Sequence, residues 1–172
     1  MKVWSLIILL TVWMVLVSCG YEETNSQGYA DVSPPKDTPS DMTGFVMKQQ
    51  KDRLLVVHWD ESDTDRKSRA MWVSDPPKGN WLGKQVEVWI QGEVLESYPE
   101  QGKAQSISVL EMSEVDGAEM EASEALRKVL KKTKDEELYA LKMLVYDKKN
   151  DQWTVRLMSL SDSREIEEKV SD

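Results

Sequence analysis

The stretch that decides the fold reads VEVWIQGEVL and spans residues 86–95. Apolar and polar side chains alternate along it, which is the pattern of a strand with one buried face. Gly92 lies near the middle of the stretch, and a glycine inside a strand often marks a bulge or a tight bend. A small closed barrel needs one strand that curls between its two halves. We therefore predict a long fourth strand that bends at Gly92.

Four further β-rich runs lie around this stretch. They read FVM at residues 45–47, RLLVV at 53–57, AMWV at 70–73, and an alternating run at 104–110. Turn signals at 75–79 and 97–99 separate them. Five short strands with few helical patterns between them favour a small barrel or sandwich. The bend at Gly92 favours the barrel, so we expect a mainly β chain with an OB-like five-stranded barrel over residues 44–112.

The hydrophobic period changes to 3.6 after residue 116, which indicates a helix. Asp116 and Glu119 fit a capping box at its start. Its apolar stripe comprises Ala118, Ala122, Ala125, Leu126, Val129 and Leu130. Alternating runs at 138–146 and 153–157 then predict a hairpin. We expect an αββ extension over residues 116–160, either packed on the barrel or separate from it, and a polar tail over 161–172 in the form of a frayed helix.

The first nineteen residues carry the most specific signal. Lys2 precedes an apolar run at 3–17, and the small Ser18 stands directly before Cys19. A charged start, an apolar core and a small residue at the cleavage point describe a secretory signal peptide. The core is shorter than the roughly 20 apolar residues that a spanning helix needs. An ordinary cleaved signal with a stray cysteine and an uncleaved amphiphilic helix are the alternatives.

The run Leu16-Val17-Ser18-Cys19 resembles a bacterial lipobox. This resemblance implies that residues 1–18 are removed as a lipoprotein signal peptide and that the Cys19 thiol carries a diacylglycerol. Two acyl chains hold a protein stably at a membrane, whereas one chain holds it only marginally. Residues 19–43 contain prolines and an excess of acidic side chains, a composition that cannot bury a core, so we interpret them as an extended tether. The predicted location is the extracytoplasmic face of a cell membrane.

Composition and charge exclude several classes of function. The chain has 22 basic and 31 acidic residues and a formal net charge of −9, which argues against a general nucleic-acid binder. A single cysteine rules out an internal disulfide, and a single histidine rules out a His-cluster metal site. We expect no cofactor, no bound metal and no nucleic-acid partner.

The middle of the chain resembles the YobA-like family. The similarity rests on GFV at residues 44–46, GKQVEVW at 83–89 and ESYP at 96–99, followed by Ala104. These are small secreted or lipid-anchored proteins of Bacillus-type bacteria with no assigned activity. The resemblance covers about residues 44–110 and implies a small β-barrel outside a Gram-positive membrane.

Three patterns could carry chemistry, and each has a simpler structural explanation. His58 and Asp60 could form a general base, but no nucleophile motif accompanies them, so a surface histidine is favoured. The acidic run at 60–65 could hold Ca²⁺, but it lacks the glycine and the distal glutamate of an EF-hand loop. Ser97-Tyr98-Pro99 has no base or oxyanion hole and fits a tight turn.

The predicted barrel contains four tryptophans, which is more than the core of a small barrel needs. They are Trp59, Trp72, Trp81 and Trp89. Trp72 and Trp89 lie within predicted strands and are expected in the core. Trp81 lies in a loop with two prolines and is expected to be exposed. OB-like barrels bind oligomers on a face where aromatic side chains act as stacking platforms. Trp81, Trp59 and Tyr98 are therefore the candidate binding residues, although core packing remains the favoured role of the tryptophans as a set.

These observations favour a non-catalytic binding or interaction module over an enzyme. Its partner would be an extracytoplasmic protein, peptide or glycan, in addition to the membrane lipid reached through Cys19. An inhibitor or regulator of an extracytoplasmic enzyme, acting through residues 116–160, is the alternative hypothesis.

Replacement of Cys19 tests the lipid anchor. Cys19→Ser removes the only thiol that can be alkylated, so the variant should lose its membrane attachment or keep its signal peptide. Metabolic labelling with an alkyne fatty acid and membrane fractionation measure both properties. Wild-type labelling, migration and fractionation in the variant would show that Cys19 carries no lipid.

Overall fold

The structure, a computed structural model, describes residues 38–60 and 68–172. The predicted signal peptide, Cys19 and most of the tether lie outside the described residues, and so does the 61–67 part of the acidic run. The strands of the described chain are β1 (Met42–Gln49), β2 (Arg53–Trp59), β3 (Ser68–Ser74), β4 (Gln85–Ile90), β5 (Glu100–Leu110), β6 (Tyr139–Asp147), β7 (Gln152–Ser159) and β8 (Glu165–Ser171), and the helix is α1 (Ala122–Leu130).

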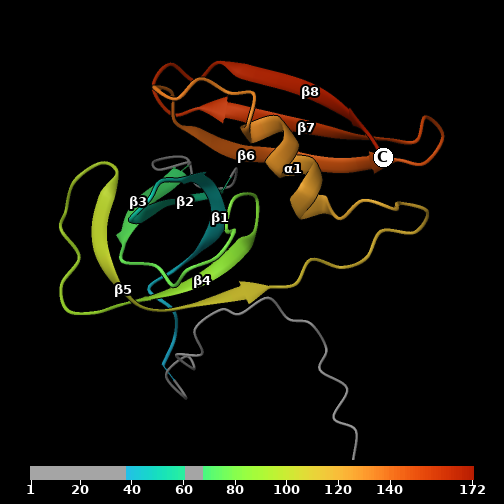
Figure 1. Cartoon of the computed structure of the whole chain (residues 1–172). Helices are drawn as coiled ribbons and strands as arrows, with labels where there is room; N and C mark the ends of the chain where they lie inside the picture. Colours follow the sequence, from blue (N-terminus) through green and yellow to red (C-terminus); the bar gives the residue numbers. More distant parts are fainter. Residues whose placement is uncertain (1–37, 61–67) are drawn as a thin grey trace, which may run out of the picture.

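The first five strands close into a barrel in the order β1-β2-β3-β5-β4 (Figure 1). β1 pairs with both β2 and β4 and so closes the ring. All pairs are antiparallel except β3 with β5, which run parallel. This order and this parallel pair are those of an OB-like barrel. The predicted mainly β fold class and the five-stranded barrel are confirmed.

The strand that joins the two halves of the barrel is β5, not β4. Residues Glu100–Lys103 of β5 pair with β3, and the rest of β5 pairs with β4 as far as Leu110. β4 ends at Ile90, and Gly92 adopts φ +83° in the turn that follows. The predicted long fourth strand is therefore wrong. The glycine serves a left-handed turn rather than a bend within a strand, because L side chains rarely adopt that backbone conformation.

Strand β2 is buried on both of its faces. Leu54 and Val56 point into the barrel, where they join its interior cluster with β1, β3 and β4. Leu55 and Val57 point outward and are equally buried, because the helix and the second sheet cover this side of the barrel. A continuous apolar run, rather than an alternating one, is the sequence pattern of such a doubly buried strand.

The C-terminal part of the chain is a helix and a three-stranded antiparallel sheet in the order β6-β7-β8. β8 occupies the predicted polar tail, so the expected frayed helix is wrong. It pairs with β7 along its length, and Arg156 of β7 contacts Glu165 and Glu167 of β8. β8 is an edge strand, and charged side chains on an edge strand protect it from pairing with other chains. The same charges hide its strand pattern in the sequence.

Helix α1 begins later than the capping box predicts. Its N-cap is Glu121, which makes no side-chain capping bond. The carboxylate of Asp172 instead accepts hydrogen bonds from the Glu119 and Met120 backbone N–H groups and from Trp153 Nε1. Desolvation opposes ionisation of this carboxylate, but the three hydrogen bonds outweigh it and lower the Asp172 pKa.

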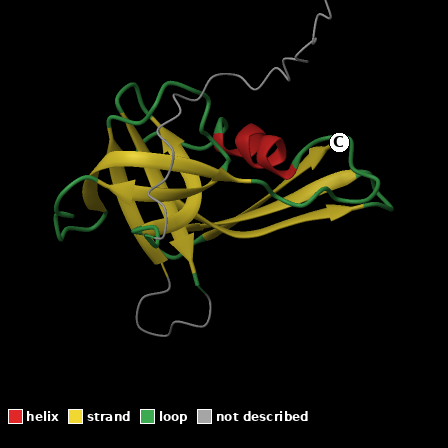
Figure 2. Cartoon of the chain, turned by 90° about the horizontal axis from the view of Figure 1, so that it is seen from below, coloured by secondary structure: helices red, strands yellow, loops and turns green. Residues whose placement is uncertain are grey.

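The extension packs on the barrel rather than standing apart from it. A single hydrophobic cluster contains Met47, Leu55, Val57 and Ala70 of the barrel together with α1 and the inner face of the second sheet. Trp153, near the start of the central strand β7, is buried in the same cluster. Figure 2 shows α1 and the three-stranded sheet extending from one side of the barrel. The barrel and the extension therefore share a core.

The shared core predicts that the outward face of β2 matters as much as its inward face. Leu55→Ala should destabilise the chain by about 2–5 kcal/mol, in the range of Leu54→Ala, because both side chains are fully buried. Urea unfolding of the two variants measures this. A cost below about 0.5 kcal/mol for Leu55→Ala, the level of an ordinary surface substitution, would contradict the packing of the extension on β2.

Candidate functional site

Trp81 does not form a binding surface. Its side chain is only 1% exposed and belongs to the cluster inside the barrel. The indole Nε1 donates to the Pro77 carbonyl at 2.8 Å, and the Trp81 backbone N–H donates to Gln49 Oε1 at 2.8 Å. The predicted exposure is wrong because the loop between β3 and β4 folds back and inserts this large side chain into the barrel.

The other three tryptophans of the barrel do not offer a stacking face either. Trp89 is buried, as expected, and its Nε1 donates to the Thr38 carbonyl at 2.9 Å. Trp72 is half-buried, with the Arg53 guanidinium 4.4 Å from its ring centre. Trp59 is also half-buried and packs against the core that the barrel shares with the extension. Core packing, the favoured role for the four tryptophans, therefore describes their positions better than a binding face does.

The outer face of β2 and β3 is the surface on which OB-folds bind oligonucleotides and oligosaccharides. In this chain Leu55, Val57 and Ala70 from that face are buried under α1 and the second sheet. The extension therefore occupies the ordinary ligand face of the fold.

The His58 and Asp60 pair lies at the end of β2. His58 is exposed and pairs in register with Arg69 of β3, and Asp60 is half-buried just beyond the strand. The residues with a defined position include no cluster of three or more His, Cys, Asp or Glu side chains that could hold a metal ion. The acidic run at 60–65, for which the sequence favours a solvated strand connection over a Ca²⁺ loop, lies mostly outside the described residues.

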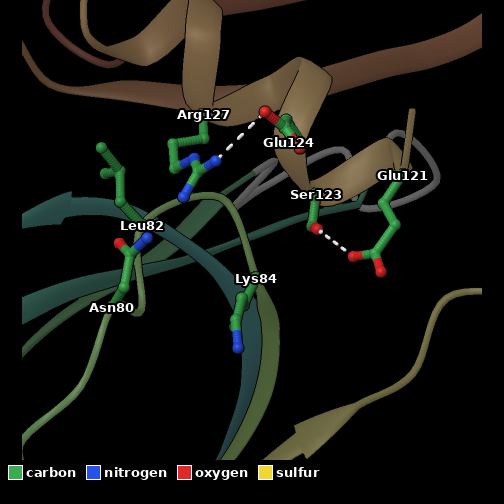
Figure 3. Close-up of a pocket in the computed structure, with 7 residues that line it drawn as sticks. All are labelled: Asn80, Leu82, Lys84, Glu121, Ser123, Glu124 and Arg127. Carbon is green, nitrogen blue, oxygen red and sulfur yellow. Dashed lines mark hydrogen bonds and ion pairs between the residues drawn. The ribbon is translucent and has the colours of Figure 1, made fainter. Parts of the chain in front are cut away.

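A shallow pocket lies between the β3–β4 loop and the start of α1 (Figure 3). Arg127 reaches from the helix toward Leu82 and Asn80 of the loop, and it pairs with Glu124 at 3.3 Å. Ser123 Oγ donates to Glu121 at 3.1 Å. Glu124 and Arg127 thus pair within the helix. Ser123 and Glu121 place a hydroxyl beside a carboxylate, but the lining residues include no histidine and no third group that would orient the carboxylate as a base. The pocket lies along the contact between the β3–β4 loop and α1, and we call this contact the seam between the barrel and the extension.

Gly83 makes this seam possible. It has φ +85°, and a Cβ at this position would lie 2.5 Å from the Ser123 carbonyl oxygen and 3.0 Å from the Arg127 backbone nitrogen. The absence of a side chain therefore lets the loop touch the helix backbone. Sequence reasoning missed this contact, because a glycine in a loop with prolines reads as a simple turn.

The loop between β4 and β5, residues 91–99, presents the largest exposed apolar side chains of the barrel. Leu95 is 63% exposed and Tyr98 is 60% exposed. Both views place this loop on the side of the barrel away from α1 (Figures 1 and 2). Tyr98, one of the three predicted binding residues, is thus accessible, whereas Trp81 is not and Trp59 is only partly so.

Hydrogen bonds fix the shape of this loop. Leu95 and Gln101 exchange backbone hydrogen bonds of 2.8 and 3.2 Å, and Ser97 Oγ donates to the Pro99 carbonyl at 2.6 Å. The Tyr98 hydroxyl lies 3.0 Å from Ser68 Oγ. Sequence reasoning placed Leu95 in a strand and so missed its exposure, although Gly92 and Pro99 on either side are turn residues.

A pair of glycine variants tests the seam. Gly83→Ala should destabilise the chain by several kcal/mol, because it combines backbone strain with a clash against the helix backbone. Gly92→Ala is the matched control, with φ +83° but no atom within 4 Å of its new Cβ, and should cost only about 1 kcal/mol. Thermal and urea unfolding compare the two variants, and equal costs would contradict the contact between loop and helix.

Comparison with known protein families gives a match that covers the barrel and assigns no activity to it. Residues 43–111 match the family described as "Protein of unknown function (DUF3221)", which spans the barrel and stops before α1. Searches of the curated proteins and of the solved structures each found no match. Over the part of the chain with a described structure, no helix has the length and apolar character needed to cross a membrane. The barrel is therefore similar to an uncharacterised domain.

Proposed function

We propose that this chain is a lipid-anchored, non-catalytic interaction module on the extracytoplasmic face of a cell membrane. The anchor is the Cys19 thiol, which follows a signal-like apolar run and a small residue. The similarity to the YobA-like family, whose members are secreted or lipid-anchored, belongs to the same proposal.

One observation carries the interaction role: the β2–β3 face is covered, while Leu95 and Tyr98 remain exposed on a well-bonded loop. A covered β2–β3 face disfavours oligosaccharide binding in the manner of other OB-folds. A fixed loop with exposed apolar side chains is instead suited to contact with a protein or peptide, since little ordering entropy is lost on binding. A protein or peptide partner is therefore favoured over a glycan.

The alternative hypothesis, an inhibitor or regulator that acts through the extension, has less support. This role would need a flat apolar patch on the outer face of the β6-β7-β8 sheet. Val145, at 52% exposure, is the large apolar side chain that this sheet exposes among the described residues. Lys142 and Arg156 form ion pairs with Glu165 on the same sheet. Exposed ion pairs contribute little to stability or affinity, so this face offers a weak docking surface.

Cross-linking of intact cells tests the proposed function. A membrane-impermeant amine cross-linker should convert the full chain into a discrete larger complex, which gel electrophoresis and mass spectrometry detect. The Cys19→Ser variant should lose this complex if the anchor brings the chain to its partner. A chain that remains monomeric at every cross-linker concentration in wild-type cells would contradict the proposal.

A further inference from the structure

We propose that the β4–β5 loop, residues 91–99, is the docking surface, and that it binds a basic and apolar segment of another protein. This inference rests on the proposed interaction role and specifies its partner. It starts from the two exposed side chains Leu95 and Tyr98, which are 63% and 60% exposed on the same loop. Tyrosine is among the residues that most often dominate binding energy in protein interfaces.

The charge of the loop determines the chemistry of the partner. Glu93 and Glu96 flank Leu95, both are exposed, and no residue of the loop is basic. Two described basic side chains lie beside the loop, and both are paired. Arg69 is held by Glu100 at 2.8 Å and by the Asp41 carbonyl at 2.6 Å, and Lys103 pairs with Asp75 at 3.4 Å. An acidic surface attracts a basic partner and repels an acidic one. An anionic lipid surface is disfavoured for the same reason.

The geometry of the loop favours a short partner segment. The Leu95–Gln101 backbone bonds and the Tyr98–Ser68 contact fix the loop before a partner arrives. Pre-organisation reduces the cost of binding. A single loop buries less area than a standard interface, so the complex should be weak and sensitive to each apolar anchor. Leu95 and Tyr98 would insert between apolar side chains of the partner, while Glu93 and Glu96 face its basic residues.

Two pairs of double variants test the docking surface in the full, anchored chain. Leu95→Ser with Tyr98→Ser should reduce the cross-linked complex roughly tenfold or more. Val115→Ser with Val145→Ser is the matched control, because those valines are 39% and 52% exposed elsewhere. Glu93→Gln with Glu96→Gln should weaken the complex and reduce its salt dependence. Glu111→Gln with Glu114→Gln, an exposed pair at the same spacing, should not.

A photoreactive benzoylphenylalanine at position 95, with position 145 as the control, identifies the partner chemistry. The expected adduct from position 95 is a peptide that carries basic and apolar residues. A lipid adduct, an acidic peptide or no adduct would overturn the proposal. Thermal unfolding of each purified variant shows whether it is folded.

The outcomes separate this inference from the proposed function. A complex that persists at wild-type yield in the Leu95 and Tyr98 double variant shows that the docking surface is wrong while the interaction role stands. A wild-type chain without any complex shows that the interaction role is wrong, and the docking surface with it.

Discussion

The burial of β2 on both faces is the constraint on which the rest of the structure depends. Leu54 and Val56 fill the barrel, and Leu55 and Val57 form the floor of the core shared with α1 and the second sheet. These four side chains are at most 1% exposed, and the burial of each one stabilises the fold. The hydrophobic effect acts on both sides of the strand at once. The extension cannot leave without exposing the outer two.

This arrangement changes what the barrel can do. An open OB-fold presents the outer face of β2 and β3 to ligands. In this chain α1 and the β6-β7-β8 sheet cover that face. The accessible surface that remains comprises the loops and the outer side of other strands, such as β5 with its exposed Gln101, Lys103 and Gln105. Trp81 of the β3–β4 loop is buried inside the barrel, whereas Leu95 and Tyr98 of the β4–β5 loop are exposed. The fold thus moves the available interaction surface from a sheet face to a loop.

The sequence pattern predicts most of the strands and the helix of this fold. It does not predict features that depend on contacts between segments far apart in the chain. Apolar runs, alternation and turn residues predicted the five barrel strands. Half-buried strands leave a period of two, and the doubly buried β2 leaves a continuous apolar run. The strand prediction was wrong at Gly92, because a glycine in a bend and a glycine in a left-handed turn have the same sequence pattern. The strand β8 was not predicted, because its charged residues face solvent and conceal the strand pattern. Only its pairing with β7 in the structure identifies it as a strand. For the candidate site, Tyr98 was accessible as a binding residue should be, whereas the burial of Trp81 depends on a loop that folds back across the barrel.

The point where the tether meets the barrel bears on how a partner would be held. Asp41 accepts the Ile90 backbone N–H at 2.7 Å, and the Thr38 carbonyl accepts the Trp89 indole at 2.9 Å. The Arg69 guanidinium, whose pKa the hydrogen bond to Glu100 raises, also donates to the Asp41 carbonyl at 2.6 Å. The chain therefore reaches the barrel beside the end of β4, where the 91–99 loop begins. In the proposed anchored state, residues 19 to 38 span at most roughly 65 Å at about 3.4 Å per residue. A partner bound to the loop would stay within that distance of the membrane. For a partner that is itself held at the membrane, this confinement raises the effective concentration and offsets the small size of the docking surface.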